Sequence, residues 1–172
     1  MKQETDDLGY QLEHYVDPVD SPAGRKQSMA ALRKYLKAVL AKDVDTVRSL
    51  MWDDVIIELP FNESGKTDQA SYRIYRGMKE VLEFWNTAFK AEGDAEGLNE
   101  ADITMNADGT RIFIEARGKM TMPSGREYRN RYVMRFDFHD GKLRHCKEYY
   151  NPIQSAYAFG RVVAGKYKID SL

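Results

Sequence analysis

The chain divides into a first part with helical spacing of apolar residues and a second part with strict alternation. From Arg25 onward, apolar residues recur every three or four positions, which is typical of a helix with one buried face. That face comprises Met29, Leu32, Leu36, Val39 and Leu40. Asp43 is suited to cap a second, shorter helix, whose apolar side comprises Val44, Val47, Leu50 and Met51. A third helix is predicted after Tyr75-Arg76-Gly77, with an apolar side formed by Met78, Val81, Leu82, Trp85 and Phe89.

Strands are predicted between and after these helices. Residues 55–60 form an apolar strand that Pro60 ends, and a polar loop follows at 62–71. The third helix ends in the loop 92–97. After Ala101 the chain alternates with period two, and turn signals separate the strands 101–107, 111–122, 127–139 and 142–150. A short apolar helix, 153–159, follows Asn151-Pro152.

This order of elements predicts an α+β fold, because the helices come first and an antiparallel meander follows. We expect three N-terminal helices packed on a curved, mostly antiparallel sheet, a cone-shaped, cystatin-like α+β barrel with one central pocket for a small molecule. Residues 1–24 are expected to form an acidic leader or arm, residues 25–160 the cone domain, and residues 161–172 a C-terminal tail.

The alternation also predicts which side chains face the interior of the cone. On one strand these are Asn130, Tyr132, Met134, Phe136 and Phe138, and on the preceding strand they are Ile112, Ile114, Ala116, Gly118, Met120 and Met122. On the last strand, the set with Arg144, Cys146, Glu148 and Tyr150 is the more apolar near the strand's end, so Glu148 is predicted to lie inside. On the first strand Val55, Ile57 and Leu59 are expected inside and Glu58 outside.

Charge and composition restrict the partners. The net charge is −1, which gives no reason to expect a nucleic acid, but residues 1–22 hold one Lys against six acidic residues. This leader could dock on its own domain or on a neighbouring copy. The single cysteine, Cys146, excludes an intrachain disulfide and suits a reducing compartment. The chain shows neither the apolar core of a signal peptide nor a membrane-spanning run, so we expect a cytoplasmic protein without a membrane partner.

Glu148 is the strongest candidate for chemistry. A carboxyl placed among Tyr132, Met134, Phe136 and Trp85 would be desolvated, which raises its pKa. Such a group can take a proton from a carbon next to a carbonyl and return it elsewhere. Tyr132 and Asn130 could donate hydrogen bonds to the developing enolate oxygen. On the sequence alone a second interpretation stays open, in which Glu148 pairs with a surface arginine. The candidates for that pairing are Arg144, Arg131 and Arg117.

Other residue types give weaker signals. His14, His139 and His145 are interpreted as surface residues, and the sequence holds no metal-ligand spacing, glycine-rich phosphate loop or nucleophile elbow. We therefore predict neither a metal nor a cofactor. Two roles are open for the aromatic residues Trp52, Trp85 and Phe61: they either pack in the core or stack against a ligand. The candidate substrate-binding residues are Asn130, Met78, Trp85, Tyr150, Met134 and Phe61.

Taken together, these features resemble the ketosteroid-isomerase or nuclear transport factor 2-like cone fold, which includes polyketide cyclases of the SnoaL type. The segment from residue 130 to 160 is similar in particular to the closing part of the phenazine-biosynthesis A/B proteins. The residues that carry this likeness are Asn130-Arg131-Tyr132, Phe136, Gly141-Lys142-Leu143, Lys147-Glu148-Tyr149 and Asn151-Pro152-Ile153-Gln154. Tyr75-Arg76-Gly77 fits as well, and the general likeness covers residues 25–160.

The resemblance implies acid–base catalysis without a cofactor, in a homodimer. In the phenazine proteins a glutamate of the final strand works with a histidine just after the Arg-Gly pair in an imine-forming condensation. The glutamate corresponds to Glu148, whereas Met78 occupies the histidine's place. Methionine cannot transfer protons, so either Tyr132 assists Glu148 or the substrate and reaction differ.

We therefore predict a cofactor-free enzyme of secondary metabolism, such as antibiotic biosynthesis. It would be an isomerase, cyclase, dehydratase or condensation enzyme that acts on a small, partly apolar carbonyl compound. Glu148 and Tyr132 would be its catalytic residues. The alternative is a non-catalytic protein that binds a small ligand in the same cone. A third interpretation makes the sheet a dimer or partner surface.

Overall fold

The computed structural model describes residues 7–93 and 95–161. Helix α2 (Pro22–Leu40) begins three residues before the predicted start, because Ser21 caps it by accepting a hydrogen bond from the Gly24 N–H and Pro22 takes the first helical position. The buried face of α2 includes Leu32 and Tyr35. Helix α3 (Val44–Ser49) follows, capped by Asp43 as predicted.

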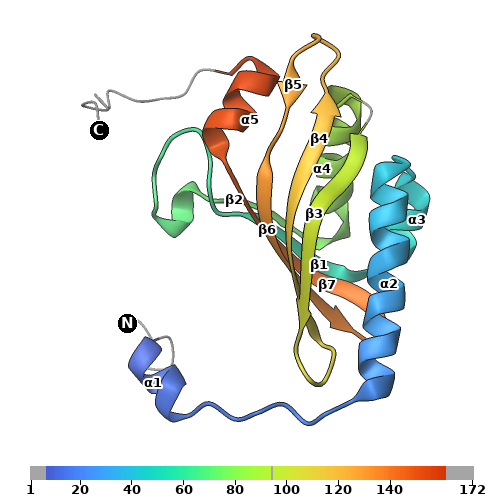
Figure 1. The fold of residues 1–172 in the computed structure, drawn as a ribbon, viewed down its shortest axis with the longest axis vertical. Helices are drawn as coiled ribbons and strands as arrows, with labels where there is room; N and C mark the ends of the chain where they lie inside the picture. Colours follow the sequence, from blue (N-terminus) through green and yellow to red (C-terminus); the bar gives the residue numbers. More distant parts are fainter. Residues whose placement is uncertain (1–6, 94, 162–172) are drawn as a thin grey trace.

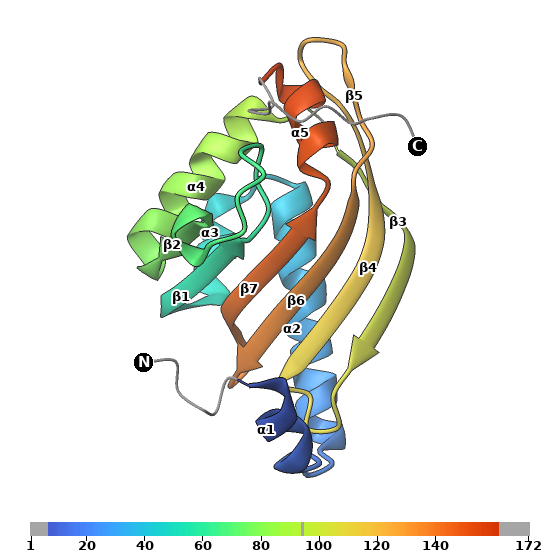
Figure 2. The ribbon, with the colours of Figure 1, turned by 90° about the vertical axis from the view of Figure 1, so that its left-hand side faces the viewer.

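A curled sheet of seven strands lies against these helices. Its strands are β1 (Met51–Leu59), β2 (Arg73–Arg76), β3 (Ala95–Met105), β4 (Arg111–Thr121), β5 (Glu127–Tyr128), β6 (Arg131–His139) and β7 (Lys142–Tyr150). Their order is β2-β1-β7-β6-β4-β3, with β5 paired to β4. Only β1 and β7 pair in parallel among the described strands. Figure 1 shows the long strands crossing the molecule, and Figure 2 shows α2 and α4 together on one side of the sheet. The predicted α+β cone is confirmed.

Two further helices complete the cone. Helix α4 (Gly77–Ala91) packs on the sheet through Val81, which is fully buried. Helix α5 (Pro152–Phe159) is capped by Asn151 and ends at Gly160, whose φ of 65° is the left-handed conformation that favours glycine. The α5 helix covers one end of the sheet in a small second core with Met120, Met122 and Tyr128 (Figure 2).

The alternation of the central strands is confirmed. Every predicted inward residue of β4 is buried, and Met134, Phe136 and Phe138 of β6 are buried as well. On β1, Val55, Ile57 and Leu59 face the core, and Glu58 lies on the outer face beside Lys147. On β7, Cys146 and Tyr150 are buried. The predicted inward set of β7 therefore lies inside along most of the strand.

Arg144 is the exception on β7, and its predicted inward position is wrong. Its side chain is exposed and donates to Asp54 at 2.7 Å, whereas the adjacent Leu143 is fully buried. The pairing of β6 with β7 is irregular at this point, because Asp137 pairs with His145 and the next residue pairs with Leu143. Such a bulge leaves one residue unpaired and reverses the alternation.

Other elements differ from the prediction for local reasons. The strand predicted at 127–139 is two strands, because the chain leaves the ladder at Arg129 and Asn130. Strand β2 lies in a stretch interpreted as loop and helix entry. Strand β3 begins at Ala95 rather than Ala101, because an exposed edge strand needs no apolar alternation once it pairs with β4.

The N-terminal leader contains a short helix, α1 (Leu8–Glu13), that the sequence did not indicate. Asp7 caps it through the Gly9 and Tyr10 N–H groups. The leader presents several apolar side chains to solvent, with Leu8 71% and Val19 85% exposed. The predicted C-terminal tail lies outside the described residues, apart from Arg161. None of the helices in the described part of the chain is long and apolar enough to cross a membrane.

Candidate functional site

A cavity with two lobes lies inside the cone. The outer lobe has a volume of about 390 Å³ and the inner lobe about 420 Å³. Both lobes are lined by the same five residues where they meet, which are Leu59, Phe84, Glu92, Tyr128 and Glu148. These five residues are therefore accessible from both lobes. Two of the five residues are carboxylic acids.

The two lobes differ in character. The inner lobe is mainly apolar and lies between α2, the C-terminal part of α4 and the sheet; its lining includes Tyr35, Leu36, Ile57, Trp85, Ile114, Met134 and Phe136. The outer lobe lies between β2, α4 and α5 and carries more charge; its lining includes Arg73, Glu80, Glu83, Tyr150, Ser155 and Arg161. The cavity thus offers an apolar end and a polar end on either side of Glu148.

Glu148 projects from β7 directly opposite Met134 of β6, on the concave face of the sheet. Burial raises the pKa of its carboxyl to about 7, the negative charge of Glu92 acts in the same direction, and Arg73 opposes both. The part of the Glu148 side chain that is not covered by protein faces the cavity. A carboxyl with a pKa near 7 is divided between its acid and base forms at neutral pH, which is the condition for carrying a proton in both directions.

Glu92 is a site residue that the sequence analysis missed. It follows the last residue of α4, and burial raises the pKa of its carboxyl to about 7, against the opposing charge of Lys42. The Lys42 Nζ also donates to the Glu92 backbone carbonyl at 2.9 Å, which ties the end of α4 to the turn after α2. We expected a loop at 92–97, and no spacing in the sequence shows that a loop carboxyl faces a cavity.

Gly93 explains how the chain brings Glu92 to this place. A Cβ atom on Gly93 would lie 1.8 Å from the Thr121 carbonyl oxygen, so the backbone passes the end of β4 more closely than any side chain allows. The glycine at position 93 is therefore the feature of the sequence that could have pointed to Glu92, because a glycine beside a helix end indicates that the backbone passes close to another segment there.

Tyr132 and Tyr128 line the cavity next to Glu148. Burial raises the pKa of the Tyr132 hydroxyl strongly, and the charges of Tyr128 and Glu148 reinforce the effect. Burial also raises the pKa of Tyr128. Both groups therefore stay protonated at neutral pH. The Tyr132 hydroxyl donates to the Tyr128 hydroxyl, which leaves the Tyr128 hydrogen for a ligand oxygen. Gly118 of β4 makes room for Tyr132, because a Cβ atom there would lie 2.7 Å from the Tyr132 ring.

Asn130 is fully buried, and its amide bonds within the protein. Its Nδ2 donates to the Tyr128 hydroxyl at 3.1 Å and to the Asn151 carbonyl at 3.0 Å. Its Oδ1 accepts from the backbone N–H groups of Arg131 and Asn151, both at 2.8 Å. These contacts fit a residue that positions Tyr128 and the start of α5 better than one that donates to a substrate.

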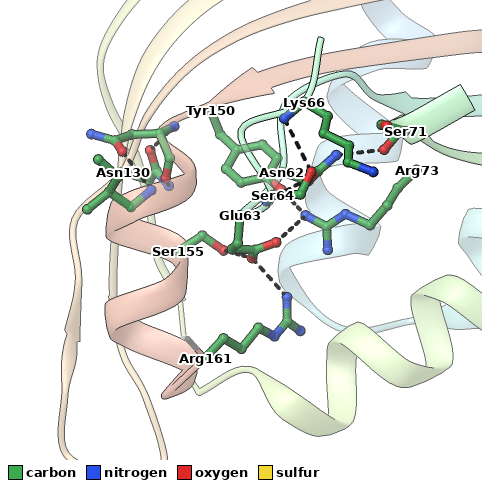
Figure 3. Close-up of polar contacts among 12 residues, drawn as sticks. Asn62, Glu63, Ser64, Lys66, Ser71, Arg73, Asn130, Tyr150, Ser155 and Arg161 are labelled. Carbon is green, nitrogen blue, oxygen red and sulfur yellow. Dashed lines mark hydrogen bonds and ion pairs between the residues drawn. The ribbon is translucent and has the colours of Figure 1, made fainter. Parts of the chain in front are cut away.

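Charged residues surround the outer lobe (Figure 3). Glu63 lies between Arg73, at 3.9 Å, and Arg161, at 3.2 Å. Burial raises the pKa of Glu63, but its own backbone N–H and the two guanidinium groups outweigh burial and lower it overall. Arg73 also donates to the Tyr150 hydroxyl. The Ser155 hydroxyl of α5 also donates to Glu63 at 3.5 Å, so this network joins the loop after β1 to α5 beside the polar end of the cavity.

The remaining predicted residues divide between the cavity and other places. Trp85 and Met134 line the inner lobe, and Tyr150 lines the outer lobe. Met78 packs against the main core. Phe61 is 47% exposed and contacts the Tyr149 ring. Neither residue lines either of the two lobes. The sequence could not separate these cases, because a large apolar residue serves the core as readily as a ligand.

The alternative pairing of Glu148 with a surface arginine is wrong. Arg144 pairs with Asp54 at 2.7 Å, and Arg117 and Arg131 both pair with Glu100 at 3.0 Å. All three lie on the outer side of the sheet, away from Glu148.

The histidines lie outside the cavity. His145 lies on the outer face of the sheet, as predicted, where its side chain is 22% exposed and contacts Glu58 and Arg135. The His139 side chain is 58% exposed, and His14 lies in the exposed leader. Among the described residues, no group of three or more His, Cys, Asp or Glu side chains could hold a metal ion.

The fold is a cone whose cavity is faced by a buried carboxyl, and comparison with known families shows the class of protein to which it belongs. Residues 32–146 match the model of the SnoaL-like domain, so the chain belongs to the SnoaL-like family. The resemblance to this cone fold predicted from the sequence is confirmed.

Solved structures share this fold, and a curated relative is similar in sequence. A Bacillus subtilis protein provisionally described as an isomerase is 19% identical, with a TM-score of 0.69 over 83% of this chain and 99% of that one. The phenazine biosynthesis-related protein PhzB2 of Pseudomonas aeruginosa is 20% identical, with a TM-score of 0.60 over 87% and 95% of the two chains. The uncharacterized protein YesE of Bacillus subtilis is 21% identical over 78% of this chain and 88% of its own length.

Proposed function

We propose that this chain is a cofactor-free acid–base enzyme that moves protons on a small, partly apolar carbonyl compound. The observation that carries the proposal is the position of Glu148 at the junction of an apolar and a polar lobe, with its pKa raised to about 7 by burial. An isomerase, cyclase, dehydratase or condensation enzyme would use such a group. Similar structures include proteins described as an isomerase, as polyketide cyclases and as a phenazine biosynthesis-related protein, which supports a role in secondary metabolism such as antibiotic biosynthesis.

The proposed reaction begins with ionised Glu148. Its carboxylate takes a proton from the carbon next to the substrate carbonyl, and the bonding electrons move onto the carbonyl oxygen. Tyr128 donates a hydrogen bond to that oxygen, and Tyr132 supports it by donating to the Tyr128 hydroxyl. Burial keeps both groups protonated, so the developing charge is stabilised. Return of the proton from Glu148 to a different carbon completes an isomerisation.

Glu92 would supply the second proton position that a dehydration or condensation needs. Two neighbouring carboxyls in a desolvated site do not both ionise readily, so near neutral pH the pair holds one proton. With Glu148 as the base, protonated Glu92 can donate to a leaving hydroxyl. In this proposal Glu92 takes the place of the second acid–base group, since Met78 cannot transfer a proton and packs in the core.

The test measures proton transfer on a probe ketone, 2-tetralone, by following deuterium uptake from heavy water at the carbons beside its carbonyl. We expect Glu148→Gln to lower the protein-catalysed uptake by about 100-fold or more while binding of 2-tetralone persists. Glu115→Gln, an exposed glutamate on the outer face of β4, is the matched control and should leave uptake unchanged.

Two results would contradict the enzyme proposal. Uptake that is equal in the wild-type protein and in Glu148→Gln would exclude Glu148 as the proton carrier. Tight binding of 2-tetralone without any catalysed uptake would favour the non-catalytic binding protein instead.

We also propose a homodimer in the cytoplasm. The exposed apolar side chains Leu8, Leu12 and Val16 of the acidic leader support contact with a second copy, because such residues gain stability when an interface covers them. Light scattering on the full chain should show a dimer, and a Leu8→Glu, Leu12→Glu double variant should weaken it. An unchanged dimer in this variant would exclude the leader from the interface. The buried thiol of Cys146 suits a reducing compartment.

A further inference from the structure

The guanidinium group of Arg73 lies in the wall of the outer lobe without a close carboxylate partner. Its side chain is 31% exposed, and it projects from β2 beside Tyr150 and Glu63 (Figure 3). It donates to the Tyr150 hydroxyl, which carries no charge. Its ion-pair contact in the described part of the chain is with Glu63 at 3.9 Å, which is too long for a hydrogen bond. The charge of Arg73 is therefore available to a ligand in this lobe.

Glu63 is held mainly by other groups. Its Oε1 accepts from Arg161 at 3.2 Å and from the Ser155 hydroxyl at 3.5 Å, whereas only Oε2 faces Arg73. Arg73, Ser155 and Arg161 all line the outer lobe, and Glu63 itself does not. This wall of the lobe thus already binds one carboxylate, which comes from the loop after β1. That carboxylate neutralises Arg161 at close range and Arg73 only weakly.

The sheet places Arg73 two strands away from Glu148. Arg73 pairs with Leu59 of the neighbouring strand β1. On the other side of β1, Glu58 pairs in parallel with Lys147 of β7. The residues that follow them, Leu59 and Glu148, are therefore level as well. Since neighbouring strands lie about 4.8 Å apart, the backbones of Arg73 and Glu148 are roughly 10 Å apart, with the outer lobe in front of both.

The carboxyls of the outer lobe leave room for an anion at Arg73. Glu80 accepts from the backbone N–H of the residue before α4 at 2.7 Å, and Glu83 is exposed, so water screens both charges. Burial raises the pKa values of Glu92 and Glu148 to about 7, so both are partly protonated at neutral pH. An anion beside Arg73 would therefore raise the protonated fraction of Glu148.

We propose that Arg73 binds a carboxylate of the substrate in the outer lobe, so that the substrate is an oxo acid whose carbonyl lies at Glu148. A guanidinium has five N–H donors in a planar arrangement that fits the two oxygens of a carboxylate. The hydrogen bond to Tyr150 uses one of them. The inference rests on the proposed function for the place of the carbonyl and names the class of its substrate. The binding of a carboxylate at Arg73 concerns affinity alone.

The experiment compares two probes of nearly the same shape by isothermal titration calorimetry, 4-oxo-4-phenylbutanoate and its uncharged amide, 4-oxo-4-phenylbutanamide. The wild-type protein should bind the oxo acid more tightly than the amide. Arg73→Gln should weaken binding of the oxo acid roughly 10- to 100-fold, the effect of hydrogen bonds to a charged group, and binding of the amide by less than about 3-fold. Arg76→Gln, an exposed arginine on the same strand, is the matched control and should change neither affinity.

A second readout uses the wild-type protein, so it does not depend on a variant that folds. A carboxylate bound at Arg73 offsets the positive charge that favours ionised Glu148, so Glu148 takes up protons when the oxo acid binds. Calorimetry near neutral pH in two buffers with different ionisation enthalpies measures this uptake. We expect proton uptake with the oxo acid and none with the amide.

Three results would overturn the carboxylate subsite. They are wild-type binding of the oxo acid that is no tighter than binding of the amide, an Arg73→Gln variant that loses affinity for both probes equally or for neither, and binding of the oxo acid without proton uptake. The failure of the proposed function is a different result, because it fails when Glu148→Gln leaves deuterium uptake unchanged, whatever the affinity for the two probes.

Discussion

Glu92 at the end of α4 and Glu148 on β7 face the same cavity, and the negative charge of Glu92 raises the pKa of the Glu148 carboxyl. The two residues are far apart in the sequence and come from different layers of the fold. Burial raises the pKa of each carboxyl to about 7, so each is divided between its acid and base forms in the physiological range. The charge of Glu92 adds to the effect of burial, which is the larger cause of the raised pKa of Glu148.

Replacing Glu92 by Gln should lower the pKa of Glu148, because it removes the negative charge that disfavours ionisation there. Carbon-13 NMR of the labelled glutamate carboxyls would follow the titration directly. Arg73→Gln should shift the pKa of Glu148 in the opposite direction, since Arg73 favours the ionised form. The exposed Glu115→Gln variant serves as control, and equal Glu148 titrations in all four proteins would show that the carboxyl is not coupled to its neighbours.

The stability of the protein should depend on Glu148 between about pH 4.5 and pH 7. A carboxyl whose pKa is raised in the folded state binds protons more tightly there than in the unfolded chain. Its contribution is fully present below the unfolded pKa, and it is lost as the pH rises through the folded pKa of about 7. At 1.36 kcal/mol for each pKa unit, the change is about 3 kcal/mol.

Urea unfolding of the wild-type protein and Glu148→Gln at several pH values would measure this difference. The variant should gain stability relative to the wild-type protein as the pH rises from about 4.5 to 8. Parallel stability curves for the two proteins would mean that Glu148 has the same pKa in the folded and unfolded states.

Gly118→Ala should damage the site through Tyr132. The new methyl group would lie 2.7 Å from the Tyr132 ring and 3.3 Å from its hydroxyl, so the ring must move. We expect a loss of about 1–3 kcal/mol in the free energy of unfolding and a reduced rate of deuterium uptake. In a Tyr132→Leu background the same substitution should cost less stability, because the ring is gone. Equal costs in both backgrounds would place the strain elsewhere.

Asn130→Ala should lower the stability of the fold, and not only the affinity for a ligand. Its amide makes four hydrogen bonds that join β6 to Tyr128 and to Asn151 at the start of α5. Removing them leaves buried backbone groups unpaired, and we expect a loss of about 2–4 kcal/mol in the free energy of unfolding. Asn99→Ala on the exposed edge strand β3 should change stability little. A stable Asn130→Ala variant that binds 2-tetralone weakly would instead support direct contact of Asn130 with the ligand.

The sequence predicted the fold where alternation and capping agree. The buried faces of β4 and β6 followed from period-two spacing, and α3 and α5 followed from Asp43 and Asn151. Only the second half of the edge strand β3 was predicted, because the pairing of its first half with β4 determines the conformation there and its own side chains do not. The bulge that turns Arg144 outward is a property of two strands together, so one strand's pattern does not reveal it.

For the site, the sequence located the inward position of Glu148 through the apolar residues beside it. The inward orientation of the Glu92 side chain was not predicted, because a loop has no periodicity that indicates where its side chains point. Asn130 was predicted to face inward and does, but only the contacts in three dimensions show that its amide bonds to Tyr128 and Asn151. Tyr35 was not considered at all, since an aromatic residue on an apolar helix face is most simply a core residue.

The most direct test of the account is the pH dependence of deuterium uptake by 2-tetralone, in the wild-type protein and in Glu148→Gln. The base form of Glu148 carries the proposed reaction, so the wild-type rate above background should rise with pH through a midpoint near 7. That rise should be absent in Glu148→Gln. A wild-type rate without an inflection near pH 7, or the same inflection in Glu148→Gln, would contradict the account.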